Sequence, residues 1–334
     1  MRKLDRERAL LEVVYDAHEF TSIEHRDKPD FLLTRRKPEY KFGVEITEIF
    51  ETESHARLHF HPEYIERLFA GARPMHRDDE KELALSRVSI SDPDGNPKAS
   101  DVPAIIRETR PTVERYSAVA RRLQEKERKL DGYEHLGHTN LIIADQCGQP
   151  SEVGPDGQYN VSDLLVPALR SALGTSRFRE VFLVSMMRDG KIKYRPLHQL
   201  MLLEKFFVFC RACAVFDGWA EGAYPLNEDA AVLFAWVQSH SGWPVSLYER
   251  AGGTFAAMYR GSGAALGRSS VEILDFYDFP SPPAVPPAEP PVDRKVLRNF
   301  TSFYTSFADE NMFSCKVFIP ARNTPPLAVV SEGF

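Results

Sequence analysis

The chain has 334 residues, of which 43% are hydrophobic and 27% are charged, and its formal net charge is −6. This length can bury a large core in one or two domains, and the acidic balance excludes a generally basic surface, so any contact with phosphates must be local. Four cysteines are too few for a disulfide framework, which favours a reducing, cytoplasmic location.

Neither a signal peptide nor a membrane span is expected. Residues 1–8 are mostly charged and lead into no continuous apolar segment. The most apolar run, residues 200–216, is interrupted by Glu204, Lys205 and Arg211, which would lie in mid-bilayer if the run spanned a membrane. We interpret the run as a buried element of a cytoplasmic protein.

The first fifty residues predict a helix followed by a two-stranded hairpin. Residues 4–20 repeat apolar side chains at the helical period. The apolar residues 31–33 predict a short strand, which ends at the charged turn 34–39. Side chains alternate along the second strand, residues 40–50. One face carries Phe42, Val44, Ile46 and Glu48, and the other carries Gly43, Glu45, Thr47 and Ile49.

The remaining elements up to residue 200 predict an α/β fold with a mixed sheet. Residues 51–110 are polar and are interpreted as an insertion of helical and irregular pieces. Beyond it, apolar periodicity and continuous apolar runs predict further elements. These are a helix at 112–130, a strand at 141–144, a helix at 161–173 and a strand at 181–184. Continuous hydrophobicity in the later strands indicates a sheet covered by helices on both faces.

Three segments follow this core. Residues 201–280 are expected to form an α/β region of unassigned role. Residues 281–295 are a proline-rich connector, which favours an extended conformation. Residues 296–334 carry many aromatic side chains, so we expect this C-terminal extension to dock rather than to extend freely.

The hairpin carries the residues that suggest chemistry. Asp30 stands just before the first strand and Glu45 lies inside the second. Phosphodiester hydrolysis needs an activated water and a cation that offsets charge on the phosphate. Mg²⁺ prefers carboxylate, carbonyl and water oxygens, and the two carboxylates could converge on one such ion. Within a strand that is mostly apolar, Glu45 also needs a partner.

The sequence Lys28-Pro29-Asp30-Phe31-Leu32-Leu33, followed by Phe42-Gly43-Val44-Glu45-Ile46-Thr47-Glu48, resembles the PD-(D/E)XK nuclease superfamily. The resemblance implies a restriction-endonuclease-like core over residues 1–200. It also implies that Asp30, Glu45 and the Ile46 carbonyl are ligands of Mg²⁺ or Mn²⁺.

One residue departs from the family motif, because Thr47 stands where the lysine is expected. In some branches of the superfamily a basic residue from the following helix takes over that position. Lys126 and Lys129 are the candidates, since they lie three residues apart on one helical face. The alternative is loss of catalysis.

Further site residues are also expected. The family uses a glutamate of the first helix, for which Glu12 is chosen and Glu24 is the alternative. Arg35, Arg36, Lys37 and Lys41, at the hairpin tip, are candidates for contacts with nucleic-acid phosphates or for a solvated turn.

The sequence thus predicts a cytoplasmic, metal-dependent nuclease that acts on DNA rather than RNA, in restriction or defence against foreign DNA. A homodimer or a multi-protein defence complex is the expected assembly, without a membrane partner. Two alternatives stay open. One is a catalytically inactive relative that binds nucleic acid or protein, and the other is an interaction module that docks through its proline-rich and aromatic segments.

Overall fold

The computed structural model describes most of the chain. The described residues are 3–74, 76–92, 94–106, 111–133, 137–147, 159–186, 192–219, 230–266, 271–287, 289–310 and 316–317. Two residues expected to take part in docking, Phe313 and Phe318, lie outside these ranges.

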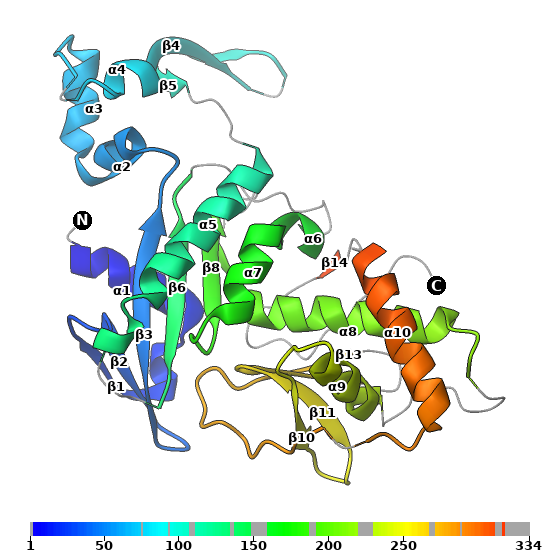
Figure 1. Ribbon diagram of the computed structural model, residues 1–334. Helices are drawn as coiled ribbons and strands as arrows, with labels where there is room; N and C mark the ends of the chain where they lie inside the picture. Colours follow the sequence, from blue (N-terminus) through cyan, green and yellow to red (C-terminus); the bar gives the residue numbers. More distant parts are fainter. Residues whose placement is uncertain are drawn as a thin grey trace.

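The N-terminal part is built on a six-stranded mixed sheet (Figure 1). In spatial order its strands are β1 (Phe20–His25), β2 (Phe31–Arg35), β3 (Tyr40–Ile49), β6 (Thr139–Asp145), β8 (Val181–Met186) and β9 (Ile192–Pro196). Strands β3, β6 and β8 are parallel, and the other neighbours pair antiparallel. The predicted mixed α/β class is therefore confirmed.

Helices cover both faces of this sheet. On one face, α1 (Lys3–Val14) buries Leu11 and Val14 against apolar side chains of β2, β3, β6 and β8. On the other face lie α5 (Thr112–Glu127), α7 (Pro167–Thr175) and α8 (Leu197–Val215). The alternation along β3 decides which side chains meet which helices, since Val44 and Ile46 join the α1 side and Ile49 joins the α5 side.

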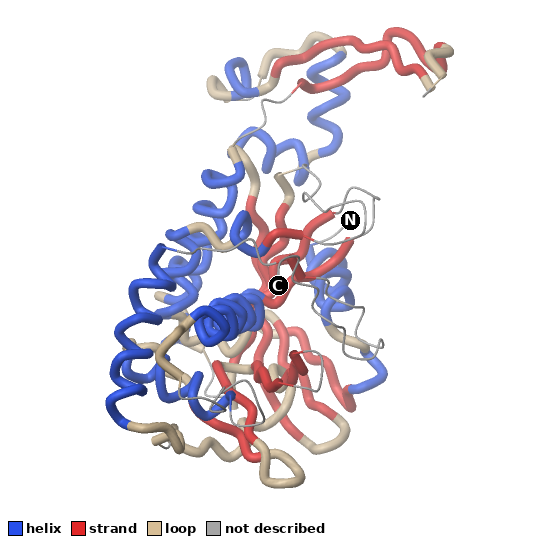
Figure 2. The backbone as a smooth tube through the Cα atoms, turned by 90° about the vertical axis from the view of Figure 1, so that its right-hand side faces the viewer, coloured by secondary structure: helices blue, strands red, loops and turns tan. Residues whose placement is uncertain are grey.

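The segment between β3 and α5 projects away from the sheet (Figure 2). It comprises α2 (Glu53–Phe60), α3 (Pro62–Phe69), α4 (Asp79–Glu82), β4 (Ala84–Ser91) and β5 (Pro97–Ile106). Its small core is stabilised by Asp79, whose carboxylate accepts hydrogen bonds from Arg57 and from the Tyr64 hydroxyl, the latter at 2.6 Å. The hairpin β4–β5 corrects the expectation of helical and irregular pieces alone.

A second sheet, of four antiparallel strands, forms the C-terminal part with two helices. The elements are α9 (Ala230–His240), β10 (Ser246–Glu249), β11 (Phe255–Tyr259), β12 (Ser262–Leu266), β13 (Val271–Asp275) and α10 (Arg294–Glu310). Helix α8 packs against both sheets, and α10 packs on α8 through Phe300. One hydrophobic cluster runs through both parts, so a boundary at residue 200 would fall inside α8.

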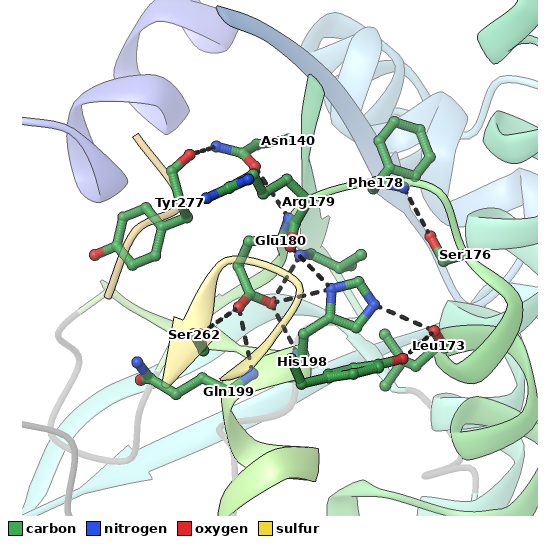
Figure 3. Close-up of polar contacts among 12 residues, drawn as sticks. Asn140, Leu173, Ser176, Phe178, Arg179, Glu180, His198, Gln199, Ser262 and Tyr277 are labelled. Carbon is green, nitrogen blue, oxygen red and sulfur yellow. Dashed lines mark hydrogen bonds and ion pairs between the residues drawn. The ribbon is translucent and has the colours of Figure 1, made fainter. Parts of the chain in front are cut away.

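Glu180, at the start of β8, joins the two parts (Figure 3). Its fully buried carboxylate accepts hydrogen bonds from the backbone N–H groups of His198, at 2.8 Å, and Gln199, at 3.3 Å, in the first turn of α8. It also accepts one at 3.3 Å from the hydroxyl of Ser262 in β12. This carboxylate caps α8, whose first N–H groups have no partner within the helix.

Shorter elements complete the described chain. They are η1 (Ala17–Glu19), η2 (Leu130–Gly132), α6 (Val161–Leu164), β7 (Tyr159–Asn160) and β14 (Lys316–Val317). Cys210 and Cys213 are buried core residues of α8, as their apolar surroundings predict. Among the described helices, none has the length and apolar character to cross a membrane.

Candidate functional site

The two carboxylates of the predicted metal site lie side by side at one end of the β2–β3 pair. Strand β2 pairs Phe31 with Val44, so one further step of this antiparallel register places Asp30 opposite Glu45. Both side chains then point to the sheet face that α5 covers. Oδ2 of Asp30 accepts a hydrogen bond of 2.8 Å from the Ile46 N–H.

The Ile46 carbonyl lies on the same side of β3 as Asp30. In a strand, the N–H and C=O groups of one residue point toward the same neighbouring strand. Because the Ile46 N–H reaches Asp30, its carbonyl also faces the β2 side, just beyond the last paired residue of β2. The carbonyl therefore faces the side of β3 on which Asp30 lies.

Lys126 comes to the same point from α5, which lies across the face of β3 and β6 (Figure 1). Its neighbours Val119 and Leu123 are buried against the sheet and fix the rotation of the helix. Its Nζ atom lies 2.5 Å from Oε1 of Glu45, and the Lys126 side chain is 15% exposed. Thr47 carries no positive charge, but Lys126 brings an ammonium group to Glu45 from a different element.

Two buried oxygens in the site have no hydrogen-bond partner among the described residues. They are Oε2 of Glu45 and the hydroxyl of Tyr133, which follows η2. Burial and the adjacent Glu45 carboxylate raise the pKa of the Tyr133 hydroxyl. The Tyr133 hydroxyl and the Glu45 carboxylate nevertheless interact with each other, so Lys126 and Tyr133 both position Glu45.

The electrostatics of Asp30 favour a cation. Burial, together with the charges of Glu45 and Glu7, raises the pKa of its carboxyl to about 6, although the Ile46 N–H and Lys126 oppose this shift. A carboxyl group whose pKa is raised by neighbouring carboxylates lies in a region of negative potential, which a divalent cation would relieve.

Helix α1, which covers the opposite face of the sheet, buries Glu7 and leaves Glu12 exposed. Glu12 is exposed and pairs with Arg8 at 2.8 Å. Glu7 is buried on the same stripe as Leu11, contacts Lys3 at 3.3 Å and raises the pKa of Asp30. The helical period identifies Glu7, because positions 7, 11 and 14 share a face. Apolar neighbours next to Glu12 in sequence point to other sides of the helix.

The structure keeps the other predicted basic residues apart from the carboxylates. Arg35 pairs with Glu19 at 3.0 Å and with Asp278, so it holds the hairpin on the C-terminal part. Arg36, Lys37 and Lys41 are exposed near the hairpin tip. The tip lies four to five residues along the strands from Glu45, about 14 to 17 Å at the usual strand rise. Lys129 is exposed and lies beyond the last residue of α5.

The side chains present fit a cation with oxygen ligands. Two carboxylates and one carbonyl match the usual protein share of a Mg²⁺ site, where waters complete the shell. Within the described ranges, however, no group of three or more His, Cys, Asp and Glu side chains is arranged to hold a metal ion. The described residues therefore supply two carboxylates to this site and no third one.

Comparison of the chain with protein-family models, with curated proteins and with solved structures gives no match. Its function is therefore inferred from its own residues.

Proposed function

We propose that this chain is a Mg²⁺- or Mn²⁺-dependent nuclease that hydrolyses phosphodiester bonds of DNA. The observation that carries the proposal is the contact of Lys126 with Glu45, beside Asp30. Two carboxylates and an ammonium group, supplied by three different elements, converge where the hairpin and α5 meet. A purely structural ion pair between Lys126 and Glu45 would not require Asp30 beside it. The pKa of Asp30 is raised by burial and by the nearby charge of Glu45.

Asp30, Glu45 and the Ile46 carbonyl would hold the cation. When bound, it would act as a Lewis acid toward the phosphoryl group and favour deprotonation of the attacking water. Lys126 would orient Glu45, and its charge would stabilise negative charge that develops on the phosphate. The Ile46 N–H would hold Asp30 toward the same point.

The fold agrees with the core that the resemblance implies. Helix α1, the antiparallel strands β1 to β3, the crossover helix α5 and the parallel strand β6 follow one another along the chain. A restriction-endonuclease-like core, a cytoplasmic location and a role in defence against foreign DNA are parts of this proposal. The three described cysteines are free and buried, which suits a reducing compartment.

Cleavage assays with matched carboxylate variants test the proposal. Purified protein is incubated with supercoiled plasmid and with linear duplex DNA, with Mg²⁺, Mn²⁺ or EDTA. Asp30→Asn and Glu45→Gln should each reduce the metal-dependent rate by roughly a hundredfold or more. The control Glu12→Gln removes an exposed carboxylate of α1 and should leave the rate unchanged. Absence of cleavage, or cleavage that survives in both site variants, contradicts the proposal.

A second candidate function is a catalytically inactive interaction module. It is favoured by the projecting hairpin β4–β5, a two-stranded sheet with Leu85 43% and Ile90 46% exposed. An isolated two-stranded sheet is marginally stable in water, so a protein partner would stabilise it. An assembly detected by light scattering or by partner capture, together with the absence of cleavage, would favour this function. Replacing Leu85 and Ile90 by Ser should then abolish the assembly.

A further inference from the structure

Lys126 is the middle member of a basic stripe on α5. Arg122, Lys126 and Lys129 are spaced at i, i+4 and i+7, which places them on one side of the helix. The backbone at Arg128 and Lys129 is still in the right-handed helical region, so the stripe continues past the last residue of α5. Lys126 turns inward to Glu45, and the other two side chains flank it toward solvent.

The two flanking side chains are available to a ligand. Arg122 is 40% exposed and contacts only Glu125, at 3.0 Å, among the described residues. Such exposed pairs contribute little to stability, so the guanidinium can exchange this partner for another anion. Lys129 is exposed, and no described residue forms an ion pair with it.

Arg177 pairs with two acidic side chains near this end of α5. Its Nε atom donates to Glu127 at 2.8 Å, and its Nη1 atom donates to Asp131 at 2.5 Å. The Arg177 backbone N–H and the Ser176 hydroxyl also bind the Glu127 carboxylate, at 3.0 and 3.1 Å. Because Arg177 holds these two acids, they do not pair with Arg122 or Lys129, and the stripe keeps its positive charges beside the carboxylate pair.

We propose that Arg122 and Lys129 contact two phosphates of a nucleic-acid backbone, on either side of the phosphate that Asp30 and Glu45 would hold. Seven residues of helix span about 10.5 Å, which equals the rise of about three nucleotides of one strand along the axis of duplex DNA. This inference rests on the proposed nuclease function and names the surface that binds its substrate. It assigns that surface to α5 instead of the hairpin tip, where Arg35 is occupied by Glu19 and Asp278.

The salt dependence of DNA binding tests this surface. Affinity for a linear duplex is measured in EDTA, where cleavage does not interfere, over a series of NaCl concentrations. Removing two phosphate contacts should reduce the slope of log affinity against log salt by about 1.8. Arg122→Ala/Lys129→Ala is the test variant. Arg121→Ala/Arg128→Ala is the matched control, because it removes the same charge from α5 on the side opposite Lys126.

The expected result is a slope that falls in the test variant and stays close to the wild-type value in the control. An equal fall in both variants, an unchanged slope in the test variant, or no binding by the wild-type protein overturns the inference. Parallel cleavage assays in Mg²⁺ separate it from the proposed function. If the three proteins show the expected slopes but the wild type does not cleave DNA, only the proposed nuclease function is contradicted. If the wild type cleaves DNA but the slope of the test variant is unchanged, only the proposed binding surface on α5 is contradicted.

Discussion

The ammonium nitrogen of Lys126 lies 2.5 Å from Oε1 of Glu45, although 81 positions separate the two residues in the sequence. Glu45 is buried in β3, and the carboxylate would be costly there without a cation. Thr47, two residues further along the same face, offers none. The packing of α5 on the sheet therefore supplies the charge that the strand itself lacks.

Lys126 and Lys129 should differ in their effect on the cleavage rate. We expect Lys126→Met to reduce the single-turnover cleavage rate at saturating DNA by roughly 10²- to 10³-fold, because it removes a preorganised charge beside the reacting group. Lys129→Met should leave this rate unchanged, since Lys129 is exposed beyond the end of α5 and saturating DNA offsets the loss of its phosphate contact. Rapid-mixing kinetics on a labelled duplex measures both. Equal losses in the two variants would assign no special role to the Lys126–Glu45 contact.

The two glutamates of α1 should differ in their effect on metal affinity. Glu7 is buried and acts electrostatically on Asp30, whereas Glu12 is exposed and paired with Arg8. We expect Glu7→Gln to weaken Mn²⁺ binding by about ten- to a hundredfold, in the range of residues that support metal ligands. Glu12→Gln should bind as the wild-type protein does. Titration calorimetry with Mn²⁺ gives both constants, and a stronger effect of Glu12→Gln would reverse the assignment.

Asp30 should make stability fall with rising pH in the absence of metal. Its pKa is raised to about 6 in the folded protein, against about 3.9 for an unfolded aspartate. The folded state therefore binds the proton more tightly, and this contribution to stability is complete below about pH 4 and is lost as the pH rises through about 6.

Urea denaturation of wild-type protein and Asp30→Asn in EDTA, at pH 4 to 7, isolates this contribution. The free energy of unfolding of the wild type, minus that of the variant, should decrease between pH 4 and 6 and then level off. Mn²⁺ at pH 7 should stabilise the wild type more than the variant. A difference that is constant or increases over this range contradicts the raised pKa.

The sequence predicts the hairpin and the central strands because their patterns of apolar side chains are local in the sequence. The alternation along β3 and the apolar runs of β6 and β8 depend on neighbours in sequence, and all three strands form where they are predicted. Strand β1 is missed because it is an edge strand, in which only Phe20 is buried and the other side chains are partly or fully exposed.

The candidate site is less accessible to sequence reasoning because its members meet through tertiary packing. The motif residues Asp30 and Glu45 can be named from one hairpin. Choosing Lys126 over Lys129 requires the rotation of α5, which its buried face fixes only once the helix has packed. The choice of Glu7 needs the helical period instead of adjacency. Tyr133 reaches Glu45 only through the turn after α5, which no periodic pattern specifies.

Glu180 should be the carboxylate whose loss most weakens the connection between the two sheets. Its oxygens accept backbone N–H groups from the first turn of α8 and the hydroxyl of Ser262 from β12, in a fully buried position. Glu180→Gln replaces one acceptor oxygen by a donor that faces other donors. We expect a loss of about 2 to 4 kcal/mol in the free energy of unfolding, since buried N–H groups are left without partners.

The control variant is Glu249→Gln, an exposed change on β10, whose free energy of unfolding should stay within about 0.5 kcal/mol of the wild type. Urea unfolding followed by tryptophan fluorescence measures both variants. Comparable stabilities for the two would mean that α8 and β12 are held to the first sheet by apolar packing alone.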